Sequence, residues 1–575
     1  MQSQDFDVDR SGCAGWFAFV SLIILSAVLV GSCSGNRTSP TATESKEKEA
    51  TVAVVPGQSE FLPKTGRELY LHHCAACHGE NGDGKGIASA YLFPKPRDFR
   101  AGKFRLVSTK NNVPTPEDLD AALVRGMPGS SMPPWNHLNA DQRKLLVEEV
   151  VRLRREGARE QYIRILKEVD ELTDEEIAEA DVQQEIEEIV SARSTPSETT
   201  EVPEIGDPNT DSIARGKEIY VKQSCHSCHG NDGKGGGVQK MIDDEGLPTR
   251  PRDFTLGIFK GGHDPASLYR RIAYGMPGTP MPSSKQLTVE QMVDLVHFTR
   301  SLSDERTRQA AILRREKLVV NRLDAVPTFK DVSSWAGIEA VSIKTIPLWW
   351  RDDADAGLEV QAAHDGKSLA LRLTWRDDTY DNSAATTTSF EDAVAVELFR
   401  GKTEPFIGMG DPKSPVDVWY WDADRQSASD MEDVYPNAVV DIYPFNEKLV
   451  ATAEFNRPGT KAEQQPDVSL PARASGNPIV PKNDGSGTSS LTGGGPGTVT
   501  FRLPKSELVK AHGAWNEGRW TVVMTRSLAV SSADDGVSLS PGGKATIAFA
   551  IWNGSLRERD GKKLITIWQD LELEK

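Results

Sequence analysis

The hydrophobic positions of the chain follow three different patterns along its length. Residues 16–31 form a predominantly apolar run that contains no charged residue. Between 141 and 193 apolar residues recur every three to four positions, as expected for amphipathic helices. They include Leu145, Val150, Leu153, Ile163, Leu166 and Val169. After Arg308 apolar and polar residues alternate, and this period of two predicts strands.

The alternating region contains five short segments that predict strands, with turn-forming residues between them. They are 369–375, 393–399, 416–421, 519–524 and 545–552. Many short strands of this kind are typical of a β-sandwich. The stretch 456–497 is rich in glycine, serine and proline, and we expect it to be a flexible surface insertion. We expect Trp419, Trp421 and Trp520 to lie in the core rather than to act as electron relays.

The apolar run near the N-terminus has the length of a signal-peptide hydrophobic segment, because its 16 residues are too few for a membrane span. It ends in Val30-Gly31-Ser32-Cys33, which resembles a bacterial lipobox, so that cleavage before Cys33 would leave a lipidated cysteine. The charged residues before the run are Asp5, Asp7, Asp9 and Arg10. This mainly acidic segment differs from the positively charged n-region of a typical signal peptide. An uncleaved anchor and plain secretion remain alternatives, and all three export the chain.

The composition narrows the possible classes of protein. The net charge of −17 and the pI of about 5.2 argue against nucleic-acid binding and favour soluble behaviour or a basic partner. We expect 1–33 to be a lipoprotein signal segment. Residues 34–60 are mostly polar and cannot form a core, so we expect this segment to be a flexible tether. Four of the six cysteines belong to two short motifs, and no disulfide framework is needed for Cys13 and Cys33.

Both motifs have the form Cys-x-x-Cys-His. They are Cys74-Ala-Ala-Cys77-His78 and Cys225-His-Ser-Cys228-His229. Residues three apart on a helical turn share one face, so two thiols at this spacing can bond to the vinyl groups on one edge of a porphyrin. The histidine that follows can then ligate the iron. The pattern predicts two covalently attached c-type haems.

Each motif lies inside a longer repeated pattern, which predicts two copies of one module. A Gly-x-Glu-x-Tyr segment precedes each motif, a Pro-Arg-Asp-Phe segment follows it, and a Gly-Met-Pro-Gly segment leads to a final Met-Pro. The copies are 66–70 and 216–220, 96–99 and 251–254, and 126–133 and 275–282. The two units resemble class I cytochrome c domains, which are all-α, and we place them at 61–155 and 211–308.

That resemblance implies a methionine as the second axial ligand of each iron, from the terminal Met-Pro. These ligands would be Met132 and Met281, which follow His78 and His229 by 54 and 52 positions. Met127 and Met276 are the alternatives, with core packing as their other interpretation. We expect the histidines beside the motifs to face solvent or to pack at an edge. They are His72, His73 and His226.

Residues 156–210 are expected to form a charged helical spacer and linker between the two units. The first part of 141–193 would complete the last cytochrome helix, and the remainder would be an exposed helix. Its glutamates are interpreted as a solvated face, with an acidic docking face as the alternative. They are Glu171, Glu175, Glu176, Glu185, Glu187 and Glu188.

The region 315–575 resembles the haem-b subunit of the ethylbenzene dehydrogenase family. The matching segments are 390–396, 405–411, 416–421, 549–554 and 563–568. The resemblance implies an all-β sandwich that serves molybdenum enzymes of the dimethyl sulfoxide reductase class in electron transfer. It also implies a non-covalent b haem held by a methionine and a lysine. By motif these are Met409 and Lys563, with Lys562 as the fallback.

The residues of this third site can be judged on physical grounds. Met409 lies between two glycines, where missing side chains would let a porphyrin approach. A lysine ligand must be neutral, so Lys563 needs a buried, apolar site, which we expect between the sheets or at their open end. The alternative is a sandwich that has lost its haem, with Met409 in the core and Lys563 on an edge strand.

The sequence therefore predicts a multidomain protein, with two all-α cytochrome c domains followed by an all-β sandwich. We expect an exported electron carrier, tethered on the periplasmic side of a membrane by its lipid or an anchor. It would relay electrons between the respiratory chain and a partner such as a molybdopterin enzyme with an iron–sulfur subunit. A di-haem peroxidase is an alternative, although the Met-Pro in both units argues against an open iron. A sandwich that binds a saccharide or a protein without haem is another.

Overall fold

The structure is a computed structural model of the whole chain. It describes residues 61–199, 201–238, 240–351, 357–382, 390–427, 487–502, 509–531 and 536–575. All of them belong to one compact unit, Ala53–Lys575. The signal segment, the tether, Cys13 and Cys33 lie outside the described residues. Within the described ranges, no helix combines the length and the apolar character that a membrane span requires.

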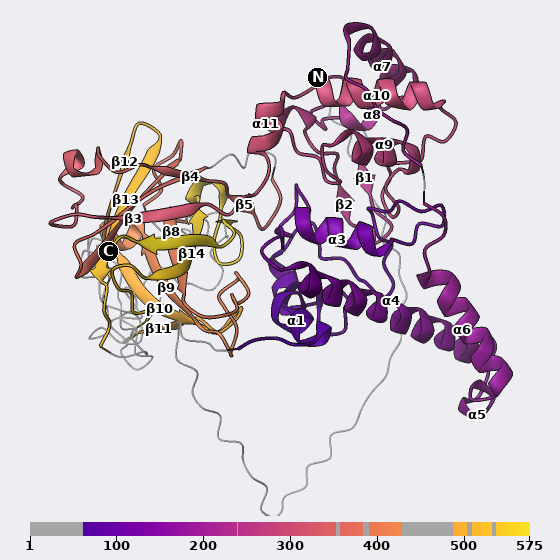
Figure 1. Cartoon of the computed structure of the whole chain (residues 1–575), viewed down its shortest axis with the longest axis horizontal. Coiled ribbons are helices and arrows are strands. Elements are labelled where there is room, and N and C mark those ends of the chain that lie inside the picture. Colours follow the sequence, from indigo (N-terminus) through magenta and orange to yellow (C-terminus); the bar gives the residue numbers. More distant parts are fainter. Residues whose placement is uncertain are drawn as a thin grey trace, which may run out of the picture. The chain divides into compact units, whose positions relative to one another are not determined.

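The two repeats fold into the same succession of helices (Figure 1). The first contains α1 (Gly66–His73), α2 (Ala75–His78), α3 (Pro116–Arg125) and α4 (Ala140–Glu168), with a 3₁₀ turn at Ile87–Tyr91. The second contains α7 (Thr210–Lys222), α8 (His226–His229), α9 (Pro265–Tyr274) and α10 (Val289–Ser301). A small ribbon of β1 (Met241–Ile242) and β2 (Pro248–Thr249), a 3₁₀ turn at Phe254–Leu256 and α11 (Glu305–Ala310) are added to the second.

Polar side chains at the helix starts explain where these helices begin. Thr65 accepts a hydrogen bond from the backbone of Glu68 while the Glu68 side chain accepts one from the backbone of Thr65, which forms a capping box at α1. The same reciprocal arrangement starts α10, with Thr288 and Gln291 as its two members. Such caps satisfy backbone donors that have no partner inside the helix.

A glycine at each helix crossing sets how closely the first and last helices of a repeat approach. A Cβ atom added at Gly66 would lie 2.4 Å from the carbonyl oxygen of Leu145 on α4, and one added at Gly216 would lie 2.1 Å from that of Asp294 on α10. The first crossing buries Leu69, Tyr70, Leu146 and Leu153 in one core, and the second buries Tyr220, Leu295 and Phe298 in another. The equivalence of the two crossings supports the internal repeat.

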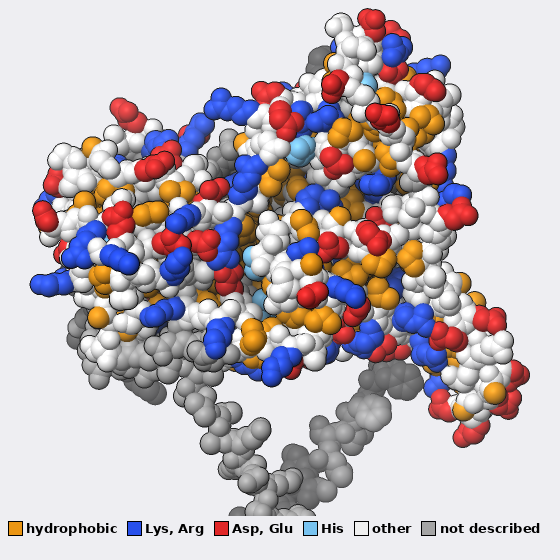
Figure 2. All heavy atoms as spheres, viewed as in Figure 1, with side chains coloured by type: hydrophobic (Ala, Val, Ile, Leu, Met, Phe, Trp, Pro, Cys, Tyr) orange, Lys and Arg blue, Asp and Glu red, His pale blue; other side chains and the backbone are white. Residues whose placement is uncertain are grey.

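The charged segment after the first repeat is a helical hairpin with a core of its own. Helix α4 is 29 residues long, and α6 (Ala180–Ser194) packs against it after the short α5 (Asp174–Ile177). Their shared core contains Ala158, Leu166, Ile177, Ile186 and Val190. The spacer is helical as expected, but it is only partly exposed, because its apolar face is buried. The glutamates still face solvent, and acidic side chains gather around α5 in Figure 2.

The C-terminal domain consists mostly of sheet. Its strands are β3 (Lys317–Arg322), β4 (Val341–Ile343), β5 (Ile346–Pro347), β6 (Leu358–His364), β7 (Ser368–Arg376), β8 (Ala393–Phe399), β9 (Val416–Asp422), β10 (Thr488–Gly493), β11 (Thr500–Phe501), β12 (Lys510–Asn516), β13 (Arg519–Ser527), β14 (Lys544–Trp552), β15 (Leu564–Ile565) and β16 (Gln569–Leu573). The short elements are 3₁₀ turns at Val332–Trp335 and Gly554–Leu556 and the helix α12 (Ala423–Ser427). The five predicted strands are confirmed as β7, β8, β9, β13 and β14.

Hydrogen bonds join the strands in the order β11-β10-β9-β8-β14-β16-β3-β6-β7-β13-β12, while β4 pairs with β6 and β15 pairs with β14 and β5. Neighbouring pairs are antiparallel except β16–β3 and β3–β6, which are parallel. Strand β10 lies within 456–497, the stretch that was expected to be a flexible surface insertion. Its Leu491 lies opposite Val418 of β9, and Thr488 to Leu491 are buried, so this part of 456–497 belongs to the sheet. Residues 428–486 lie outside the described residues.

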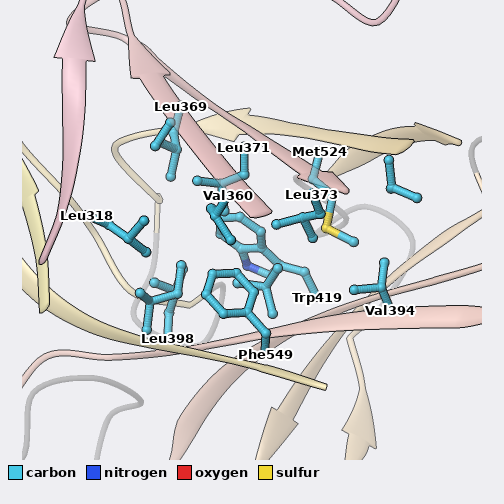
Figure 3. Close-up of a cluster of buried hydrophobic side chains, with 14 of the residues drawn as sticks. Leu318, Val360, Leu369, Leu371, Leu373, Val394, Leu398, Trp419, Met524 and Phe549 are labelled. Atoms are coloured by element: carbon cyan, nitrogen blue, oxygen red, sulfur yellow. The ribbon is translucent and has the colours of Figure 1, made fainter. Parts of the chain in front are cut away.

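The sheet encloses one large apolar core. Side chains from β6, β7 and β13 meet side chains from β8, β9 and β14 in it, as Figure 3 shows for Val360, Leu373, Met524, Val394 and Phe549. The three tryptophans that were expected in the core, Trp419, Trp421 and Trp520, are almost fully buried there. Large side chains occupy the interior of this core.

Candidate haem sites

The first Cys-x-x-Cys-His motif borders a cavity of about 1040 Å³. Cys74 caps the short helix α2, which carries Cys77 and His78, and all three side chains line the cavity. The Nδ1 atom of His78 lies 2.9 Å from the carbonyl oxygen of Arg97, so the N–H at that position can donate to it. This bond fixes the ring and leaves the Nε2 lone pair for a metal ion.

Burial keeps the imidazole of the motif neutral. The ring of His78 stacks on Phe99 with centroids 4.4 Å apart, and burial lowers the pKa of His78 to about 4. Burial likewise raises the pKa of the Cys74 and Cys77 thiols to about 12. A neutral imidazole and two enclosed thiols on one apolar wall fit a covalently attached haem, for which the thiols become thioethers.

The second motif repeats this arrangement at α8. His229 stacks on Phe254 with ring centroids 4.9 Å apart, and burial lowers the pKa of His229 to about 4. Within the described residues, the buried Nδ1 atom of His229 has no hydrogen-bond partner. In both repeats a tyrosine closes the turn: Tyr70 donates to the Gly79 carbonyl at 2.8 Å, and Tyr220 donates to the Gly230 carbonyl at 2.7 Å.

The methionine loops of the two repeats have matching hydrogen bonds. The backbone N–H of Met127 donates to the carbonyl of Met132 at 3.1 Å, and that of Met276 donates to the carbonyl of Met281 at 3.2 Å. Ser130 and Thr279 brace the loops from equivalent positions, and their hydroxyls donate to the carbonyls of Met127 and Met276. Both Met127 and Met132 line the cavity together with His78. The first loop thus presents two thioethers to the cavity.

The same cavity reaches Met409 and Lys563 of the C-terminal domain. Met409 has a backbone φ of 79°, a left-handed conformation that favours glycine and that is often retained at functional sites. Lys563 is 8% exposed, with Nζ 4.6 Å from the ring centroid of Trp552, and burial lowers the pKa of Lys563 to about 8. Lys562 instead donates to the Leu556 carbonyl at 2.9 Å. The geometry therefore favours Lys563 over the fallback.

Glu397 is a member of this site that the sequence analysis missed. It lines the cavity together with Lys563 and Met409. Burial raises the pKa of Glu397 to about 8, against the opposing effect of Lys563. The sequence pattern could have indicated Glu397. In the strand 393–399 it shares a face with Ala395 and not with the large aliphatic residues.

The cavity is lined by outward-facing residues of the sheet, so of the two expected places, between the sheets or at their open end, the structure does not support the first. Ala395, Val418 and Ala550 line it, whereas the alternate residues of the same strands, such as Val394 and Trp419, point into the core. The space between the two sets of strands is already filled with large side chains. Two of the residues that line the cavity from this face, Ala395 and Ala550, have small side chains.

Two of the flanking histidines, expected to face solvent or to pack at an edge, are buried, so they do not face solvent. The Nε2 atom of His72 lies 2.9 Å from the carbonyl oxygen of Glu404, and its Nδ1 atom lies 3.2 Å from a carboxylate oxygen of Asp411. His73 is buried 5.2 Å from Trp135, measured between ring centroids. His226 is half-buried. His72 therefore connects the helix before Cys74 to the loop that carries Met409.

Family models match part of each of the three domains. The cytochrome c family matches residues 213–303, and the family of cbb3-type cytochrome c oxidase subunit III matches residues 62–148. The ethylbenzene dehydrogenase family matches residues 333–564. Both repeats are thus cytochrome c domains, which carry haem c covalently on Cys-x-x-Cys-His motifs.

Individual relatives resemble parts of the chain. A protein named as a candidate respiratory nitrate reductase heme subunit of Haloferax mediterranei is 28% identical over 41% of this chain and 64% of its own length. The dimethylsulfide dehydrogenase subunit gamma of Rhodovulum sulfidophilum is 27% identical over 39% of this chain and 63% of its own length. The chain thus spans somewhat less than two thirds of these relatives. A solved reducing HAO-like protein complex of Kuenenia stuttgartiensis has a chain with 32% identity and a TM-score of 0.34, matched over 44% of this chain and 99% of that one.

Proposed function

Because the chain joins two cytochrome c domains to a domain of the ethylbenzene dehydrogenase family, we propose that it is an electron-transfer protein with two c haems and one b haem. Haem iron supplies the chemistry by alternating between its ferric and ferrous states. The chain's own residues hold the irons, exclude water and set the potentials. In this proposal no substrate is transformed on the chain itself.

The observation that carries the proposal is the single cavity shared by two sets of iron ligands. Cys74 and His78 line it from the first cytochrome domain, and Met409 and Lys563 line it from the C-terminal domain. A c haem and a b haem placed in it would be neighbours. Electrons could then pass between them without a layer of packed protein in their path.

The residues assigned to the irons have roles that suit their surroundings. His78 and His229 are kept neutral by burial and serve as proximal ligands. Met132 and Met281 complete the coordination of the c haems, which raises their potentials relative to two histidines. Met409 and Lys563 ligate the b haem. The lowered pKa of Lys563 supports this role, because only the neutral amine can bind iron.

The partner that fits best is a molybdenum oxidoreductase with an iron–sulfur subunit. Two relatives carry the names of subunits of a respiratory nitrate reductase and of a dimethylsulfide dehydrogenase, which supports this choice. The C-terminal sheet, which closes around one core as a sandwich, would receive or deliver electrons through the b haem. The c haems would connect it to the respiratory chain on the periplasmic side, with Cys33 as the lipid attachment point.

Haem content tests the proposal directly. The purified full-length protein should give a pyridine haemochrome with two c haems and one b haem, and its mass should exceed that of the polypeptide by two covalent haems. Met409→Ala and Lys563→Ala should lose the b component and keep both c haems, whereas the neighbouring Lys562→Ala should keep all three. A protein without a b component, or one in which Lys563→Ala retains it, contradicts the b-haem assignment.

A further inference from the structure

A group of cationic side chains lines the cavity next to the first haem motif, and one of them comes from the other cytochrome domain. Arg97 and Arg105 belong to the first domain, and Lys260 belongs to the second. Phe104 and Leu106 form the apolar wall between them. The lysine follows Phe259, which packs in the core of the second domain, so the backbone position of Lys260 is determined by that core.

Both Pro-Arg-Asp-Phe segments of the repeat contact the other cytochrome domain. Arg97 of the first segment forms an ion pair with Glu245 of the second domain. Arg252, which holds the equivalent position in the second segment, donates to the carbonyl of Gly129 in the first methionine loop. Each arginine thus contacts the other domain. The contact joins the wall of the first haem cavity to the second domain through named residues.

Two aspartates of the second domain at this contact form ion pairs with cations of the first domain. Asp243 lies 2.5 Å from Arg105, and Asp244 lies 3.3 Å from Lys103. Burial lowers the pKa of Lys260 well below the usual value for lysine, and the positive charges of Arg105, Arg252 and Arg97 act in the same direction. Arg97 and Arg105 thus have carboxylate partners, whereas the charged form of Lys260 in this wall is unfavourable unless a further anion is bound beside it.

A haem attached to Cys74 and Cys77 would bring two anions into this cavity, namely its propionate carboxylates. The vinyl edge of the ring is bonded to the cysteines, and the rest of the ring is apolar, so the propionates are its charged part. We propose that Lys260 of the second cytochrome domain, together with Arg105, binds the propionates of the haem carried by the first cytochrome domain. The inference rests on the proposed haem binding at Cys74 and Cys77.

This arrangement makes the second domain a determinant of the first haem's redox potential. A cation beside a haem stabilises the reduced state, which carries one more electron, and so raises the potential. The effect is strong because the site is enclosed by apolar side chains. A change at residue 260 therefore acts on the haem that is bonded to residues 74 and 77 and not on the haem of its own domain.

A redox titration of the full-length holoprotein tests the inference. Met132→Ala and Met281→Ala first identify which titration step belongs to which c haem. Lys260→Met should then lower the midpoint potential of the first haem by about 59 mV or more. This shift corresponds to a tenfold change in the equilibrium constant of a one-electron couple. Lys260→Arg should remain close to the parent. Lys222→Met removes an exposed lysine of the same domain and should leave both steps unchanged.

The possible outcomes separate this inference from the proposed function. A protein with no haem at Cys74 and Cys77 would refute the proposed function. If both c haems are present and Lys260→Met changes neither midpoint potential, or changes mainly that of the second haem, the proposed role of Lys260 is overturned. The proposed function would be unaffected by that result. If Lys260→Met does not retain its haems, the milder Lys260→Gln and Arg105→Gln give the same measurement, and an unchanged first step in both is the contradicting result.

Discussion

The histidines of the two Cys-x-x-Cys-His motifs have similar apolar surroundings, although 151 positions separate them in the chain. His78 stacks on Phe99 and His229 stacks on Phe254, and each phenylalanine closes a Pro-Arg-Asp-Phe segment. Burial lowers both pKa values to about 4. A residue that is neutral at all physiological pH values is a dependable iron ligand, because no proton competes for its nitrogen.

The proposed axial methionines give the first prediction at the residue scale. Replacing Met132 or Met281 by alanine should remove one sulfur-to-iron charge-transfer band and lower one redox potential, because a weak thioether ligand favours ferrous iron. The visible spectrum of the oxidised protein and a redox titration check this. Met127→Ala and Met276→Ala are the matched controls in the same loops. If Met127→Ala abolishes the band and Met132→Ala does not, the assignment is reversed.

Arg526 gives a second prediction at this scale, because it belongs to a buried ion pair. It is 3% exposed and lies 2.7 Å from Asp417, which also pairs with Arg502 at 2.5 Å. Arg526→Met would leave the Asp417 carboxylate with less compensation in a dry core. We expect the free energy of unfolding of the C-terminal domain to fall by about 3–5 kcal/mol.

Urea denaturation followed by tryptophan fluorescence measures this change. The matched control is Arg519→Met on the same strand, where an exposed arginine lies 3.2 Å from Glu359. This exposed pair should contribute less than about 1 kcal/mol. If the two substitutions lower the free energy of unfolding equally, the buried pair stabilises the domain no more than the exposed pair does.

At the scale of elements, the glycine at each helix crossing determines how tightly a cytochrome domain closes. Gly66→Ala would place a methyl group 2.4 Å from a backbone oxygen of α4, which cannot move away as a flexible side chain could. We expect a loss of about 1–3 kcal/mol in the stability of the first domain. Thermal unfolding followed by haem absorbance checks it.

Gly206→Ala is the control for this prediction, because no heavy atom lies within 4 Å of an added Cβ there. It should leave the unfolding curve unchanged. Gly216→Ala should destabilise the second domain in the same way, since its added Cβ would lie 2.1 Å from a backbone oxygen of α10. A Gly66→Ala protein as stable as Gly206→Ala would mean that the helices separate without cost.

At the scale of the whole molecule, His72 connects the first haem motif to the Met409 loop. It precedes Cys74 by two residues and lies 3.2 Å from Asp411, which follows Met409 by two residues. In His72→Ala we expect all three haems to remain and the electron transfer between the b haem and the first c haem to become slower, because this contact positions the two haems.

Stopped-flow reduction, followed separately in the b-type and c-type absorption bands, measures this rate. The control is His137→Ala, which removes an exposed histidine of the same domain. The control protein should transfer electrons at the parent rate. An unchanged rate in His72→Ala, with haem content preserved, would exclude a role for this contact in the transfer.

The sequence alone determined the features that depend on neighbouring residues. The spacing of Cys74, Cys77 and His78 is set by one helical turn, and the strands β8 and β14 follow from alternation along a single segment. The two cytochrome domains were evident because the same local pattern occurs twice. Each of these conclusions needs only the geometry of a helix or a strand, which short stretches of sequence encode.

The tertiary structure decided which distant residues share a site. It placed the cavity on the outer face of the sheet, added Glu397 to Met409 and Lys563, and brought Lys260 to a wall of the first domain's haem cavity. It also made a strand of Thr488–Gly493, whose polar residues do not alternate clearly but pair with β9. These outcomes arise from the packing of segments that are far apart in the chain, and no local period reports which segments will meet.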